Sequence, residues 1–181
     1  SDINLAITDF KKNLGYNSPF FSYPFGEYSN SFKSIIKNFG FQYAFGQHSG
    51  TADETKDFFE LPRFSINEKY GEIKRFELIL KTIPLKFKSI SPSEKFINNS
   101  NNPPEIIVEF FEDIKNIKLL NCYSNELNSW KKSEVEYLNN FKIKINLIGK
   151  FTTERGRVNC SLREPDGSWR WLGIQFVVAE L

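Results

Sequence analysis

The chain has 181 residues, a mass of 21.1 kDa and a formal net charge of +2, from 24 Lys and Arg against 22 Asp and Glu. Interspersed charges of both signs do not form the basic stripe that nucleic-acid binding needs, and 40% hydrophobic residues are ample for a packed core. One histidine and two cysteines cannot complete a four-ligand zinc site of the usual Cys/His kind. Because no apolar run approaches the roughly 18 residues that cross a bilayer, we expect a soluble chain without a membrane span.

The start of the chain indicates a segment of a longer protein. There is no methionine, so we do not expect Ser1 to be the natural start. Either a leader was removed or the segment was cut from a longer chain, and we favour the second. The first residues already form one apolar face with helical spacing, made of Ile3, Ile7, Phe10 and Leu14.

The first half alternates helix and strand. Residues 18–26 are aromatic and contain two prolines, which is typical of a short buried strand that ends in a Pro-Gly loop. Residues 30–39 predict a helix, and residues 41–45 predict a second strand. This spacing predicts a parallel strand–helix–strand unit whose two strand ends open on the same rim. Residues 73–83 predict one more helix.

The second half has the period of strands. Residues 89–104 are rich in Ser, Asn and Pro and predict a linker. Apolar and polar residues then alternate in several short segments, which predicts a small antiparallel β-sandwich with strands near 105–111, 117–123, 141–148, 157–163 and 169–178. Strong turn residues at 164–168 predict a hairpin between the last two, and Gly173 suggests a bulge.

Few residues suggest chemistry by themselves. His48 is the natural general acid or base, although a solvated loop histidine is the simpler interpretation. Arg63 can hold a carboxylate, with a structural ion pair as an equal alternative. The turn at residues 23–26 can present a backbone N–H as an oxyanion donor, with a plain turn as the stronger interpretation.

Other residues allow two interpretations each. Trp169, Trp171 and Tyr123 can form a platform that stacks on sugar rings, but tryptophans in small sandwiches usually belong to the core. Cys122 and Cys160 either bridge two strands or remain two buried free thiols.

A group of motifs in the first half resembles a known family. The segments Ser22-Tyr23-Pro24-Phe25-Gly26-Glu27-Tyr28, Gly40 to Gly46 and Leu61-Pro62-Arg63 resemble the closing half of polysaccharide deacetylase (NodB-homology) domains, a carbohydrate esterase family. The resemblance covers about residues 3–84. It implies a partial (β/α) barrel at residues 1–88, followed by the linker and, at residues 105–181, by a β-sandwich like the accessory domain of some bacterial deacetylases.

The resemblance also implies roles for single residues. The backbone N–H of Phe25 would stabilise the oxyanion, and Arg63 would compensate for Ser22, which stands where many members have Arg. The substrate would be bound by Tyr23, Pro24, Gly26, Glu27 and His48. The Asp-Asp and His-x-x-x-His motifs that bind the metal of the family have no counterpart here, so no metal ligand is assigned.

Two functions follow as hypotheses. In the first, the intact parent uses a divalent metal such as zinc to hydrolyse N-acetyl groups on an amino-sugar polysaccharide, and this chain alone binds no cofactor and is inactive. In the second, the chain is a non-catalytic carbohydrate-binding or interaction module that uses Trp169 and Trp171. Exposed edges of a half barrel would also favour self-association.

Overall fold

The computed structural model describes residues 2–179; Ser1, on which the prediction about the start of the chain depends, lies outside this range. The N-terminal part consists of helix α1 (Asp2–Leu14), strand β1 (Phe20–Ser22), a 3-10 turn (Pro24–Gly26), helix α2 (Asn30–Asn38) and strand β2 (Tyr43–Phe45). Strands β1 and β2 pair in parallel, which confirms the predicted strand–helix–strand unit.

Helix α2 holds this unit together. Ser29 begins the helix, because its hydroxyl accepts a hydrogen bond from the Phe32 amide at 3.1 Å. Ile36 on the inner face is fully buried and packs with Tyr23 and Ala44. The Tyr23 amide donates to the Phe45 carbonyl at 3.0 Å, so the two strand ends lie side by side, as predicted.

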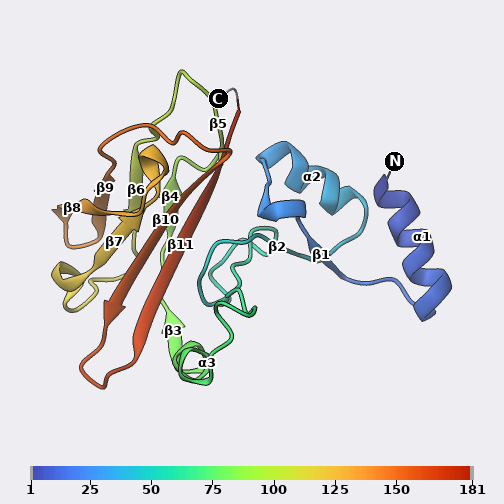
Figure 1. The fold of residues 1–181 in the computed structure, drawn as a ribbon, viewed down its shortest axis with the longest axis horizontal. Coiled ribbons are helices and arrows are strands. Elements are labelled where there is room, and N and C mark those ends of the chain that lie inside the picture. Colours follow the sequence, from blue (N-terminus) through green and yellow to red (C-terminus); the bar gives the residue numbers. More distant parts are fainter. Residues whose placement is uncertain (1, 180–181) are drawn as a thin grey trace.

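The remaining strands form one curled sheet of nine within the described residues. Its order is β3-β11-β10-β7-β8-β9-β6-β4, with β5 beside another part of β11. The bounds are β3 Thr82–Pro84, β4 Ser89–Ser91, β5 Phe96–Ile97, β6 Ile106–Glu109, β7 Asn121–Ser124, β8 Lys131–Asn139, β9 Lys142–Asn146, β10 Arg155–Arg163 and β11 Trp169–Val178, and helix α3 covers Ile73–Leu80. Figure 1 shows the sheet on one side, with β1, α2 and β2 next to β11 and α1 at the far end.

The longest strands confirm the predicted hairpin. Strands β10 and β11 pair antiparallel over nine residues, from Arg155↔Val177 to Arg163↔Trp169. The Glu164 amide donates to the Ser168 carbonyl at 2.9 Å and closes the turn. The pairing runs without interruption through Asn159↔Gly173, so the bulge expected at Gly173 is absent from this hairpin.

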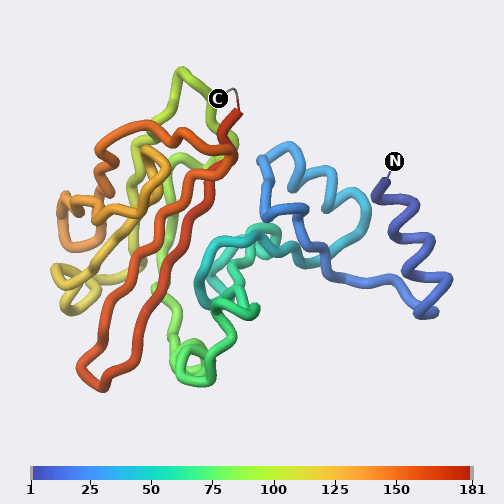
Figure 2. The backbone as a smooth tube through the Cα atoms, viewed as in Figure 1, coloured from blue at the N-terminus to red at the C-terminus, as the bar shows by residue number. Residues whose placement is uncertain are grey.

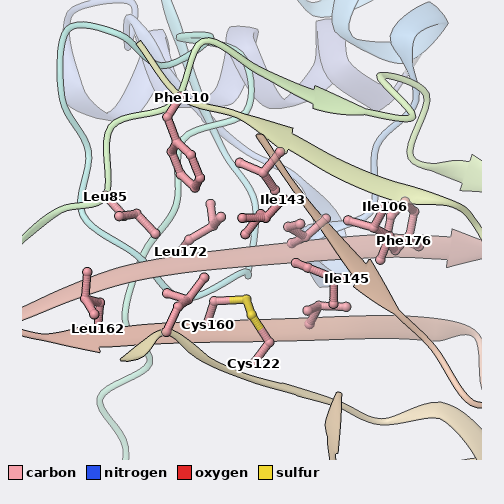
Figure 3. Packing of buried hydrophobic residues seen from close by; sticks show 14 of the residues in the cluster. Leu85, Ile106, Phe110, Cys122, Ile143, Ile145, Cys160, Leu162, Leu172 and Phe176 are labelled. Carbon is pink, nitrogen blue, oxygen red and sulfur yellow. A yellow bond between two sulfur atoms is a disulfide. The ribbon is translucent and has the colours of Figure 1, made fainter. Parts of the chain in front are cut away.

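The core lies inside the curl of the sheet. Ile143 and Ile145 of β9 face Cys160 of β10 and Leu172 of β11, and all four are buried (Figure 3). Cys122 and Cys160, directly opposite on β7 and β10, form a disulfide, which decides between the two alternatives left open by the sequence.

The predicted fold class is wrong. A partial (β/α) barrel would continue the parallel strand–helix pattern through residue 88. In the described chain, only a single parallel bridge from Phe45 to Leu61 extends the β1–β2 pair, and β3 already joins the curled sheet beside β11. Residues 89–104 contribute β4 and β5 to the same sheet. Residues 105–181 are therefore part of a larger, mostly antiparallel sheet. Its two outermost strands, β3 and β4, come from residues before 105.

Strand β8 is absent from the sequence prediction. Val135 and Tyr137 alternate with Glu134 and Glu136, but the buried position before them is Ser133 and most of the remaining residues are exposed, so the apolar pattern is short. Ser133 and Ser124 are buried and share a hydrogen bond at 2.6 Å. Within residues 2–179, no helix combines the length and the apolar character needed to cross a membrane.

Candidate ligand-binding cavity

The unit formed by β1, α2 and β2 is followed by residues 46–64, here called the junction loop. This loop contacts the outer face of β11. Figure 2 shows this segment between α2 and the sheet. A Cβ atom added to Gly173 would lie 2.7 Å from the Ser49 amide nitrogen and closer still to its carbonyl oxygen. Only glycine at position 173 therefore allows the two backbones to approach this closely. The Gln175 side chain adds a hydrogen bond to the Gly26 carbonyl at 3.0 Å.

A cavity of about 250 Å³ lies beside this contact. It is bounded by the junction loop, the start of α2, the connection from β3 to β5 and the middle of β11. Apolar side chains form part of the wall, namely Phe87, Ile90, Trp171 and Ile174. Charged and polar side chains form another part, including Lys33, Lys56, Lys95, Asp57, Glu60 and His48. The volume is slightly below that of drug-sized pockets and suits a small metabolite.

The β11 edge at the cavity is unpaired. Strand β3 pairs with Trp169–Trp171 and β5 pairs with Val177–Val178, and no strand of the described chain pairs with the edge between them. The Val177 amide donates to the Lys95 carbonyl at 2.8 Å on this side. Because backbone N–H directions repeat every second residue, the amide of Gly173, which lines the cavity, points to the same side.

Lys33 is neutralised by two carboxylates. Its Nζ lies 2.9 Å from Asp57 Oδ2 and 2.8 Å from Glu60 Oε2. Burial lowers the pKa of the Lys33 ammonium, but Glu60 and Asp57 outweigh this effect and leave the pKa above its ordinary value. The group of Lys33, Asp57 and Glu60 therefore carries one net negative charge.

Lys56 has one carboxylate partner and an aromatic one. Its Nζ lies 3.4 Å from Asp53 Oδ2 and 3.8 Å from the centre of the Phe87 ring. Burial lowers the pKa of Lys56 despite the attraction of Asp53. Burial also raises the pKa of Asp53, but hydrogen bonds from Thr55 and the charge of Lys56 outweigh it and leave that pKa low. The Lys56–Asp53 pair is thus charged and close to neutral in sum.

Lys95 differs from both. It is only 3% exposed, and its ammonium donates to the carbonyls of Pro92 at 2.6 Å and Ser93 at 3.4 Å. No carboxylate of residues 2–179 forms an ion pair with it, and burial lowers its pKa. Because an ammonium has three donors, one remains for another acceptor.

Three buried polar atoms without partners belong to residues that line the cavity. Within the described part of the chain, eight buried side-chain nitrogen and oxygen atoms lack a hydrogen-bond partner, and three of them, His48 Nδ1, Thr51 Oγ1 and Trp171 Nε1, are on cavity residues. Buried polar groups in native proteins nearly always have a partner, and unpaired ones are costly. These three atoms, together with the buried Lys95, mark the cavity as the candidate functional site.

His48 should make folding sensitive to acid. Burial lowers the pKa of its imidazole from 6.5 to about 4, and the charges of Lys95 and Lys56 act in the same direction. The attraction of Glu60 opposes this shift but is weaker than the effect of burial. As the pH falls from 6.5 to 4, the unfolded chain binds a proton that the folded chain does not, so the free energy of unfolding decreases by about 3 kcal/mol. Urea denaturation across this pH range should show the decrease in the wild type and a smaller one in His48→Gln. If the free energy of unfolding decreases equally with falling pH in the two proteins, the lowered pKa of His48 is not the cause.

The residues predicted as a catalytic loop have structural contacts. Tyr23 is 1% exposed and its hydroxyl donates to the Phe59 carbonyl at 3.0 Å. Glu27 pairs with Arg155 at 2.7 Å, and the Arg155 guanidinium lies 4.9 Å from the centre of the exposed Phe25 ring.

The rest of the predicted site is divided between the loop and the cavity. Pro24 and Gly26 belong to the same 3-10 turn, and the Gly26 carbonyl accepts the hydrogen bond from the Gln175 side chain of β11. Arg63 Nε donates to the Gly46 carbonyl at 2.8 Å. Of the residues assigned to the deacetylase site, only His48 lines the cavity, and Trp171 of the carbohydrate-binding alternative lines it too. The lysines and Glu60 were missed because they come from three separate segments, and no local motif links them.

Comparisons with known proteins add a weak similarity. No protein-family model matches the sequence, and no curated protein matches it. Among solved structures, the chain is similar to PcoC, a copper resistance protein from Escherichia coli, at 15% identity and a TM-score of 0.39, over 52% of this chain and 99% of that chain. A similarity at this level carries no argument about function. Within residues 2–179, no three His, Cys, Asp or Glu side chains are grouped to hold a metal ion.

The deacetylase interpretation is therefore wrong. The resemblance rested on three short motifs, but the chain forms a curled β-sheet in place of the barrel that would carry the deacetylase site. The hydrolase function and the amino-sugar polysaccharide partner fall with it. The carbohydrate-binding alternative also lacks support, because Trp171 packs edge-on against Phe64 with ring centres 5.5 Å apart, so the two tryptophans form no free platform.

Proposed function

We propose that this chain is a binding module that holds a small organic acid in the cavity between the junction loop and β11. The observation that carries the proposal is Lys95, a residue of the cavity wall whose buried ammonium has only two carbonyl acceptors. A buried charge without a counter-ion is unfavourable by itself, so a protein gains little from keeping it unless a ligand uses it.

The surroundings of Lys95 suit a carboxylate. The buried Thr51 hydroxyl and Trp171 indole N–H provide donors that lack protein partners. The Gly173 amide points to the unpaired side of β11, as the Val177 amide does where it donates to the Lys95 carbonyl. An anion seated there would satisfy several donors at once, and hydrogen bonds between charged groups are the strong ones.

The remaining wall suits an apolar body. Phe87, Ile90 and Trp171 line the cavity, so the part of the ligand beyond the carboxylate would be hydrocarbon. The small volume favours an acid of a few carbon atoms over a polymer.

Binding of 4-methylpentanoate tests the proposal, with its amide as the uncharged counterpart. We expect saturable binding of the acid at millimolar or lower concentration, and at least about tenfold weaker binding by Lys95→Met, because one charge-assisted hydrogen bond is lost. A titration of the protein amide and indole NMR signals gives the affinity and shows whether the Trp171 indole signal moves.

The stability of the variant provides a second readout. Methionine at position 95 removes a buried charge while keeping the shape, so the free energy of unfolding of Lys95→Met should be equal to or higher than that of the wild type. Lys86→Met is the matched control, because Lys86 is half-exposed and pairs with Glu54 outside the cavity. Equal binding of acid and amide, or unchanged binding by Lys95→Met, would overturn the proposal.

A further inference from the structure

The cavity is lined by charges of both signs. Lys95 presents an ammonium with no carboxylate in an ion pair among the described residues. Lys33 is shared by Asp57 and Glu60, which leaves one net negative charge. All four side chains line the same cavity. A simple anion would use only Lys95.

Glu60 has capacity for a second cation. Its Oε2 accepts from Lys33, and Oε1 accepts no hydrogen bond from residues 2–179. A carboxylate offers about four lone-pair positions, so one contact to Lys33 does not saturate it. The side chain of Glu60 is 20% exposed, which is enough to reach a ligand but keeps the charge partly desolvated.

Tyr28 adds an aromatic ring beside Lys33. It is 4% exposed and lines the cavity, and Lys33 Nζ lies 5.9 Å from the centre of its ring. Burial raises the pKa of the Tyr28 hydroxyl well above its ordinary value, and the charge of Glu60 raises it further, as expected in a negative potential. An ammonium placed here would be attracted by both the carboxylate and the ring.

We infer that the ligand is a zwitterion, an amino acid with an apolar side chain, whose carboxylate contacts Lys95 and whose ammonium contacts Glu60. This inference rests on the proposed function and makes it more specific. The side chain would lie against the apolar wall, where Phe87 and Ile90 contribute. Each charge of the ligand would thus meet a protein charge of opposite sign in the same cavity.

Leucine and two analogues that each lack one of its charged groups test this. L-Leucine carries both charges, 4-methylpentanoate lacks the amine and 3-methylbutylamine lacks the carboxylate. We expect leucine to bind at least about tenfold more tightly than either analogue, because each analogue leaves one charge-assisted contact unmade. In Glu60→Gln, leucine and 4-methylpentanoate should bind with nearly equal affinity, since glutamine keeps the shape without the charge. Glu54→Gln, on an exposed residue outside the cavity, should behave as the wild type.

The outcomes separate the two proposals. If 4-methylpentanoate binds as tightly as leucine, and Lys95→Met weakens both, the zwitterion is excluded while the organic acid remains. If neither compound binds, or Lys95→Met changes nothing, the binding function itself is overturned. If leucine is preferred and Glu60→Gln does not reduce the preference, the ammonium does not lie at Glu60 and the inference fails.

Discussion

Gly173→Ala is expected to separate the junction loop from the sheet and abolish binding in the cavity. The added Cβ would lie 2.7 Å from the Ser49 amide nitrogen and nearer to its carbonyl oxygen. Both atoms belong to backbone, so no side-chain rotation can relieve the overlap, and overpacking of this kind costs about 1–3 kcal/mol. That cost acts directly on the contact between the junction loop and β11.

The measurement is limited proteolysis together with circular dichroism. We expect cleavage within residues 46–64 in Gly173→Ala at protease concentrations that leave the wild type intact, with the strand signal unchanged. Binding of 4-methylpentanoate should be lost in parallel. Wild-type resistance to proteolysis in the variant would show that the junction does not depend on this close approach.

Gly156→Ala is the matched control on the paired strand. A Cβ at position 156 would lie 2.7 Å from Cε2 of Phe151, and closer to other ring atoms, on the core side of the sheet. Phe151 is 1% exposed and cannot turn away. This variant should therefore lose stability of the sheet itself, seen as a lower midpoint of urea unfolding, whereas Gly173→Ala should change mainly the junction.

Loss of the Cys122–Cys160 disulfide is expected to destabilise the protein by about 4 kcal/mol, the chain-entropy value for a 38-residue separation. The bond connects β7 to β10 and restricts the unfolded chain, while in the folded state both cysteines are buried and paired across the strands. The measurement compares urea unfolding of the wild type with Cys122→Ala/Cys160→Ala. Reductant added to the folded wild type should have little effect, because the sulfur atoms are inaccessible.

Tyr123→Ala provides the control for this pair. Tyr123 lies between Cys122 and Ser124 on β7, but its side chain points to the other face and is 45% exposed. Its replacement should change stability far less than loss of the disulfide. If the double alanine variant unfolds at the same urea concentration as the wild type, the bond is not a stabilising cross-link.

Local patterns in the sequence predicted the elements that depend on neighbouring residues. The helical face of residues 30–39 and the turn chemistry of residues 164–168 correspond to α2 and to the β10–β11 hairpin. The period of β9 and β10 was also readable, because alternate residues face a core that excludes water. Such features need only contacts a few residues apart along the chain.

The arrangement of these elements was not readable in the same way. The predicted helix at residues 73–83 overlaps strand β3, which pairs with β11 about 90 residues later and not with a neighbour along the chain. Strand β8 is mostly polar, because one of its faces is in water and its inward positions include a hydrogen-bonded serine. Short strands are stabilised by the strands with which they pair, and local sequence patterns do not show which strand that is.

The cavity depends on tertiary structure even more strongly. A lysine at position 95 and a glutamate at position 60 are ordinary surface residues in any local reading of the chain. Only the packing of the junction loop against β11 removes them from water and sets them on one cavity. Helix, hairpin and strand period were thus encoded locally, whereas the burial that turns ordinary charges into a candidate site was decided by contacts between distant segments, because desolvation is a property of the packed molecule.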